Sequence, residues 1–463
     1  MKSVWFRKKP VGELLNNHNG VKLTKTLGPF DLIMLGVGAI IGTGIFILPG
    51  TVAASHSGPA IVYSFILAAI VCAFAGMCYS EFASAIPVAG SAYTYGYVVF
   101  GELIAWLVGW ALLLEYGLAV ASVATGWSSY LNSLLAGFNL AIPQAISGPW
   151  NPANGTYINV PAVAIVLVIA ALLTIGIRES TKINTIMVFV KVGVILLFIG
   201  VGIFYVQPVN WQPFMPFGVS GVLTGTSLVI FAYLGFDAVS SAAEEVINPR
   251  RNMPIGIIGS LVICSLLYVT VSLVLTGIVP YTNLNVTDPV SFALQVIHQD
   301  WVAGIISLGA VVGMMTVILV MLYGGTRVLY ALGRDGLLPK SMYELNKKYK
   351  TPIKNTWIFS ILVALCAGFI PLSELAELVS TGTLVAFIIV SIGVIYLRKD
   401  KNIPSGGFKV PLFPFVPIAS FLLSLFLIFQ LSVHTWIACG IWFIIGLLIY
   451  LFYGSKHSLM NKK

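Results

Sequence analysis

Twelve long runs of apolar residues set the strongest limit on what this chain can fold into. Each is long enough to cross the hydrocarbon core of a bilayer as a helix, which takes about 20 residues. A lipid-exposed segment must satisfy its backbone hydrogen bonds internally, so the spanning structures expected here are helices. The sequence therefore predicts an all-α polytopic membrane protein with 12 transmembrane helices, near 30–53, 58–78, 101–126, 160–178, 184–206, 221–243, 254–279, 303–330, 355–371, 376–397, 411–430 and 436–454.

Polar chemistry is too sparse for the alternative classes. Only 9% of the 463 residues are charged, against about 25% in soluble domains. The five cysteines lie in apolar runs without a CxxC pair, so neither a disulfide framework nor a metal site is expected. The five histidines fall near the ends of the predicted spans or outside them, which argues against a membrane-embedded enzyme. A channel would typically carry a repeated filter or a ring of charges, and neither is found.

The basic residues give the predicted orientation. With the N-terminus inside, all but one of the 25 lysines and arginines fall in cytoplasmic segments, as the positive-inside rule requires. The prediction is a multi-pass protein with both termini in the cytoplasm, the first being the segment 1–29. The net charge of +9 then follows from the topology, and it would also attract anionic membrane lipid. No nucleic acid partner is expected.

Three ionisable residues lie inside predicted spans: Glu115 in the third, Lys191 in the fifth and Asp237 in the sixth. An ionisable group at mid-membrane costs about 2.5–3.5 kcal/mol on insertion scales, and it usually faces a cavity or a partner. Each of the three is either part of a transport pathway or part of a structural ion pair or snorkelling arrangement.

The first span contains an unusual density of glycine, at positions 36, 38, 42 and 44. A dinucleotide-binding loop is disfavoured because the flanks are apolar and Ile41 breaks the GxGxxG spacing. Two alternatives stay open. Gly38 and Gly42 form a small-xxx-small helix-packing motif, or the helix unwinds at 42–44 and exposes amides that attract a carboxylate.

The sixth span has a matching feature, with Gly235 at its centre. Unwinding there would free the carbonyls of Phe231, Ala232 and Leu234 to accept hydrogen bonds from an ammonium group. Interrupted first and sixth spans are a pointer to an inverted-repeat transporter. Amides in one break and carbonyls in the other suit a zwitterion, which points to an amino acid.

With these features the chain resembles the amino acid–polyamine–organocation permeases, and most closely the bacterial homologues of the cationic amino acid transporters. Five motifs in order carry the resemblance, which covers almost the whole chain: GTGIF at 42–46, EFASAIPVAGSAYTY at 81–95, FAYLGFD at 231–237, EEVINPRRNMP at 244–254 and RDGLLP at 334–339. The resemblance implies a ten-helix core at 30–397, with inverted five-helix repeats near 30–206 and 221–397. Two additional helices and a short cytoplasmic C-terminus follow at 398–463.

The resemblance also implies a mechanism of alternating access. The substrate carboxylate would bind the amides of Gly42, Thr43 and Gly44. The ammonium would bind carbonyls around Ile40, Phe231, Ala232 and Leu234. In similar proton-coupled permeases a fifth-span lysine replaces the sodium ion that bridges the first and eighth spans, and Lys191 stands at the matching position. A proton is then the expected coupling ion, with no sodium, metal or cofactor.

Selectivity depends on the remaining candidates. Glu115 and Asp237 would favour arginine or lysine if they pair with a cationic side chain, or they only balance Lys191. Met321 in the eighth span would narrow the pocket and favour small side chains if it lines the site. The expected function is proton-coupled uptake of small neutral or cationic L-amino acids across the cell membrane. The alternative is exchange of amino acids, polyamines or other organic cations without proton coupling. The sequence leaves the oligomeric state open.

Overall fold

The structure is a computed structural model, and it describes residues 5, 7–9, 25–87, 91–175, 181–349, 351–399 and 407–461. Most of the predicted cytoplasmic segment 1–29, positions 88–90 of the second motif, and several of the basic residues (Lys2, Lys22, Arg178, Lys350, Lys401, Lys462 and Lys463) lie outside the described residues. Within the described ranges the chain is helical and forms no β-strand, only isolated β-bridges.

Seven helical segments of the described chain are long and apolar enough to cross a membrane. They are Leu48–Ala85 (which includes α4 and α5), α7 (Glu102–Gly137), Ile183–Tyr205 (most of α9), α12 (Pro249–Ile278), α14 (Asp300–Arg334), α16 (Leu372–Leu397) and Val433–His457 (which includes α18). Five shorter apolar segments are α2 (Pro29–Ile40), α8 (Val160–Ile175), Gly218–Tyr233 (which includes α10), α15 (Ile353–Phe369) and α17 (Phe415–Ile428). Each predicted span overlaps at least one of these segments.

Shorter elements connect them. After the break in the first predicted span come α3 (Thr43–Phe46), α4 (Leu48–Val52) and a π-helical turn at Ala53–Ser57. The remaining short helices are α6 (Ser91–Val99), α11 (Ala238–Ser241), α13 (Pro289–Val296) and α19 (Ser455–His457). Four of the helices named above have these bounds: α5 (Ile61–Ala85), α9 (Thr181–Gly202), α10 (Gly218–Val229) and α18 (Val433–Ile449).

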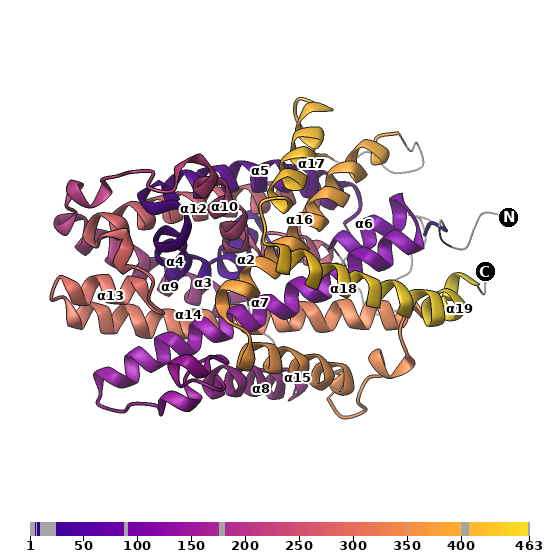
Figure 1. The fold of residues 1–463 in the computed structure, drawn as a ribbon. Helices are drawn as coiled ribbons and strands as arrows, with labels where there is room; N and C mark the ends of the chain where they lie inside the picture. The colour runs from indigo at the N-terminus through magenta and orange to yellow at the C-terminus, as the bar shows by residue number, and fades with distance from the viewer. Residues whose placement is uncertain are drawn as a thin grey trace.

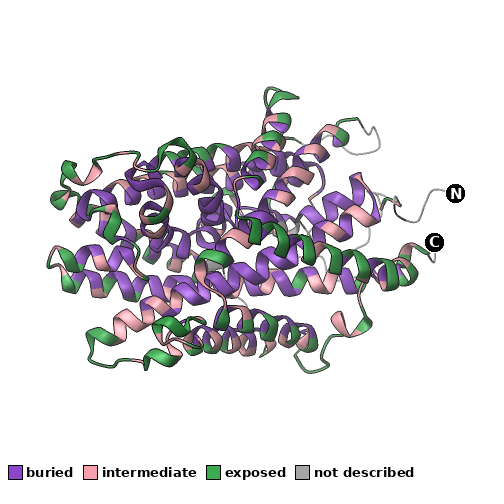
Figure 2. Cartoon of the chain, in the orientation of Figure 1, coloured by how far each residue is buried: buried purple, intermediate pink, exposed green. Residues whose placement is uncertain are grey.

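The long helix α7 lies at the centre of the molecule, where it packs against α14 and α16 (Figure 1). Most of its residues are buried, whereas α18 is exposed along most of its length (Figure 2). A pair of stacked tryptophans connects α18 to α7. The indole rings of Trp110 and Trp442 stack with centroids 4.5 Å apart, and each donates a hydrogen bond to the backbone carbonyl of the other. An aromatic pair of this kind adds about 0.5–1.5 kcal/mol to the burial of its area.

Both ends of the described chain meet at the end of α14. Lys9 Nζ lies 2.6 Å from the Asp335 carboxylate, and the Arg7 guanidinium donates to the carbonyl of Met460 at 2.9 Å. The amide of Leu459 donates to the carbonyl of Asp335 at 3.1 Å. The first and last described segments therefore lie on the same side of the helix bundle.

Two of the predicted spans are interrupted. The first stops at Ile40 and resumes at Thr43, so the break lies at Ile41 and Gly42, slightly earlier than the predicted 42–44. The sixth changes from α10 to a 3-10 turn at Ile230–Tyr233 and resumes as α11 after Gly235. Gly235 has φ +114°, a conformation that L side chains rarely adopt, which explains why glycine stands at this bend.

Candidate functional site

The two interrupted helices cross each other at their breaks. A Cβ added to Gly44 would lie 2.6 Å from the Cα of Ala232, and one added to Gly235 would lie 2.9 Å from the backbone carbon of Ala39. Carbon atoms in ordinary contact are about 3.5–4.0 Å apart. Glycine therefore allows backbone to approach backbone at both crossings, so the two breaks lie directly against each other.

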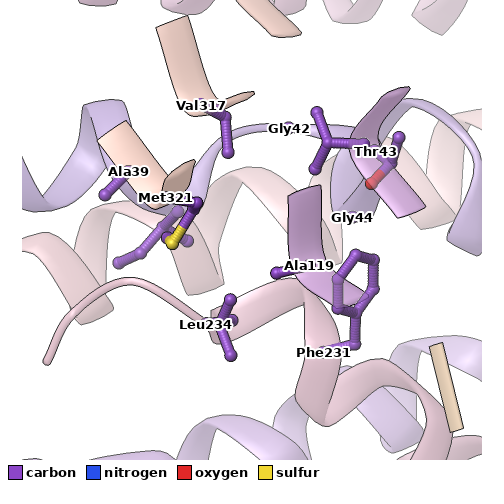
Figure 3. A pocket seen from close by; sticks show the side chains of 11 residues that line it. Ala39, Gly42, Thr43, Gly44, Ala119, Phe231, Leu234, Val317 and Met321 are labelled. Carbon is purple, nitrogen blue, oxygen red and sulfur yellow. The ribbon is translucent and has the colours of Figure 1, made fainter. Parts of the chain in front are cut away.

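A pocket lies at this junction (Figure 3). Its described lining residues come from the first break, the 3-10 segment, α7 and α14: Ala39, Ile40, Gly42, Thr43, Gly44, Ala119, Val123, Phe231, Leu234, Val317 and Met321. None of them is charged. The space between them holds about one water molecule, so an amino acid can enter only if the surrounding helices move apart. The structure therefore represents a contracted state of the pocket.

Thr43 supplies the only hydroxyl among the described lining residues. Its side chain is 1% exposed, and its Oγ1 has no hydrogen-bond partner within the described part of the chain. A buried polar atom without a partner costs about 1–3 kcal/mol. The amides of Gly42, Thr43 and Gly44 lie at the start of α3, where the first N–H groups of a helix have no partner within that helix. The hydroxyl and these amides together form a group of donors suited to an anion.

The carbonyls of the two breaks are partly occupied. The hydroxyl of Tyr268 on α12 lies 2.6 Å from the carbonyl oxygen of Ala232 and 3.1 Å from that of Ile40, while Leu234 N–H donates to the carbonyl of Phe231. One hydroxyl hydrogen thus serves two carbonyls, one from each interrupted helix. Sequence reasoning missed Tyr268, because nothing in the sequence separates it from the other tyrosines in apolar runs.

Glu115 and Asp237 are both buried, at 2% and 4% exposure, but neither is among the described residues that line the pocket. The Thr383 hydroxyl donates to Glu115 Oε1 at 3.0 Å, and the Tyr116 hydroxyl donates to Asp237 Oδ2 at 2.7 Å. Glu115 Oε2 has no hydrogen-bond partner among the described residues. In this conformation the two carboxylates form hydrogen bonds with neighbouring helices.

Lys191 on α9 is fully buried. Its Nζ donates to the carbonyl of Gly38 on α2 at 2.8 Å. Its aliphatic chain covers Gly313 on α14, where an added Cβ would lie 2.9 Å from Lys191 Cγ. The lysine thus contacts both the first and the eighth apolar segments, next to the first break.

A search of protein families matches residues 27–435 to the family described as amino acid permease. The chain belongs to this family. It is 53% identical to the methylthioribose transporter of Bacillus subtilis, over 99% of each chain, and 50% identical to the branched-chain amino acid permease BcaP of the same organism, over the full length of both. It is 31% identical to cationic amino acid transporter 4, vacuolar, of Arabidopsis thaliana, over 97% of this chain and 94% of the relative.

Membership settles the broad class of this permease. It is a multi-pass membrane protein of the amino acid–polyamine–organocation superfamily, related to the cationic amino acid transporters. It is a transporter of small-molecule amino acids rather than an enzyme.

Proposed function

We propose that this permease takes up neutral L-amino acids with small or aliphatic side chains by proton-coupled alternating access. The observation that carries the proposal is the pocket at the junction of the two interrupted helices, lined by apolar side chains and one hydroxyl without a partner among the described residues. The amides of Gly42, Thr43 and Gly44 and the Thr43 hydroxyl would bind the carboxylate. Carbonyls around Ile40 would bind the ammonium.

The carbonyls of Phe231, Ala232 and Leu234 in the second break would complete the ammonium site, which requires the Tyr268 hydroxyl to leave Ala232 or to share its carbonyl. Neutral side chains fit better than cationic ones because no charged residue is among the described lining. Val123, Val317 and Met321 would instead surround an aliphatic group.

Proton coupling through Lys191 is part of the same proposal. The Gly38 carbonyl accepts a hydrogen bond from Lys191 Nζ, and the aliphatic chain of the lysine contacts Gly313 on α14. Charged, Lys191 would hold α2 and α14 together; neutral, it would let them separate. No sodium, metal or cofactor is required in this scheme.

The proposed architecture follows from the same elements. The seven long and five shorter apolar segments support 12 spans in the cell membrane, with both termini in the cytoplasm. The breaks in the first and sixth segments support a core at 30–397, built of five-helix repeats near 30–206 and 221–397, with two added helices in 398–463.

Methylthioribose is a second candidate substrate, because a relative with 53% identity carries that name. It has no carboxylate and no ammonium, so it would leave the proposed donor and acceptor groups of the two breaks without ionic partners. Uptake into proteoliposomes separates the candidates. We expect an inward proton gradient, without sodium, to drive alanine and valine uptake in excess of arginine and methylthioribose. Preferential methylthioribose uptake, or amino acid exchange that ignores the gradient, would overturn the proposal.

A further inference from the structure

The methyl group of Thr43 sits against Gly126 on α7. A Cβ added at position 126 would lie 2.1 Å from Thr43 Cγ2, 3.3 Å from Thr43 Cβ and 2.8 Å from the tip of Ile47. Ile47 can move its flexible end, but the Thr43 methyl group cannot share that space with another carbon. The bare backbone of Gly126 therefore provides the space that this methyl group occupies.

The seating of the methyl group fixes the direction of the hydroxyl. Threonine has three staggered rotamers, and its chirality fixes the order of methyl, hydroxyl and hydrogen around Cβ. Here the methyl faces Gly126, and the oxygen lies on the side of Phe231 and Ala119 (Figure 3). Of the two other rotamers, one turns the oxygen toward Gly126. The other turns the hydrogen toward Gly126 and places the methyl where the oxygen now is.

We propose that Gly126 is a positioning residue for substrate recognition, which leaves space for the Thr43 methyl group and so lets the hydroxyl face the pocket. The inference rests on the proposed function, since it assigns that hydroxyl to the substrate carboxylate. Gly126 itself touches no substrate. Its contribution is the absence of a side chain, which makes room for the Thr43 methyl group and so makes available the one rotamer that presents the hydroxyl.

Four variants test the inference: Gly126→Ala, Thr43→Ser, the double variant Gly126→Ala/Thr43→Ser, and Thr43→Val. With alanine at position 126, only the rotamer that presents a methyl to the pocket avoids the clash, so radiolabelled L-alanine and L-valine should bind about 10- to 100-fold more weakly to purified protein. Thr43→Val presents a methyl directly, and it should show the same loss without added bulk at position 126.

Serine at position 43 lacks the methyl group, so it can keep its hydroxyl in place when position 126 carries a Cβ. The double variant should therefore bind within about threefold of Thr43→Ser alone. A merely structural role for Gly126 would not predict this rescue. Thermal unfolding and size-exclusion profiles report folding, and if Gly126→Ala does not fold, Thr43→Val and the double variant carry the test.

The binding measurements separate failure of this inference from failure of the proposed function. Native affinity in Gly126→Ala or Thr43→Val, or a double variant as weak as folded Gly126→Ala, would overturn the inference. Absence of alanine and valine binding by the native protein would instead overturn the proposed function.

Discussion

Replacing Gly44 with alanine tests whether the close crossing of the two interrupted helices is required for binding. The new Cβ would lie 2.6 Å from Ala232 Cα, about 1 Å closer than an ordinary carbon contact. Because the obstacle is backbone, no rotamer change relieves it, and α3 must move away from the 3-10 segment. Overpacking of this kind costs about 1–3 kcal/mol. Since substrate must contact both segments, we expect about 10- to 100-fold weaker amino acid binding.

Equilibrium binding of L-alanine to purified protein measures the effect. Gly193→Ala on α9 is the matched control, because an added Cβ there meets nothing within 4 Å, and it should bind like the native protein. Adding Ala232→Gly to Gly44→Ala should not restore affinity, since the Cα of residue 232 remains. Affinity within about threefold of native in Gly44→Ala, or full rescue by Ala232→Gly, would refute the reasoning.

Further predictions concern Lys191, Tyr268 and Asp288. Lys191→Met should keep measurable alanine binding but lose the dependence of proteoliposome uptake on an inward proton gradient; intact coupling would exclude Lys191 as the proton carrier. Tyr268→Phe removes the donor shared by two buried carbonyls, so it should lower the free energy of unfolding by about 1–3 kcal/mol and with it the midpoint of thermal unfolding. An unchanged midpoint would mean that the carbonyls find other donors. Burial raises the pKa of the Asp288 carboxyl in the α12–α14 loop, although hydrogen bonds from Ser133 and Thr287 oppose the shift. The folded protein is therefore most stable below the ordinary pKa of an aspartate, where Asp288 is neutral. It loses stability as the pH rises through the raised pKa of Asp288. Asp288→Asn should then stabilise the protein more at pH 7 than at about pH 4, and an equal effect at both would contradict this.

The sequence by itself determined the class of this permease and the approximate positions of its apolar helices. The apolar runs located the segments that form membrane-length or shorter helices, because a helix that crosses lipid needs a continuous apolar stretch. The glycines of the first and sixth runs indicated the interruptions within about two residues, because unwound backbone favours a residue without a side chain. The ordered motifs indicated the superfamily, which the family comparison confirmed.

The tertiary structure decided which side chains meet. Glu115 and Asp237 were candidates because of their depth in the predicted spans, yet their carboxylates accept hydrogen bonds from Thr383 and Tyr116 instead of lining the contracted pocket. Depth follows from position along the chain, whereas direction follows from the rotation of each helix about its axis. That rotation is set by packing against neighbours distant in sequence.

The same limit explains the two contacts that the sequence did not suggest. Tyr268 reaches the carbonyls of Ile40 and Ala232, and Gly126 accommodates the methyl of Thr43. Each contact joins segments separated by more than 30 residues, at distances that only the packed helices define. Sequence patterns record which residues are apolar, small or charged, but hydrogen bonds and van der Waals contacts depend on differences of a few tenths of an ångström, which only the assembled bundle fixes.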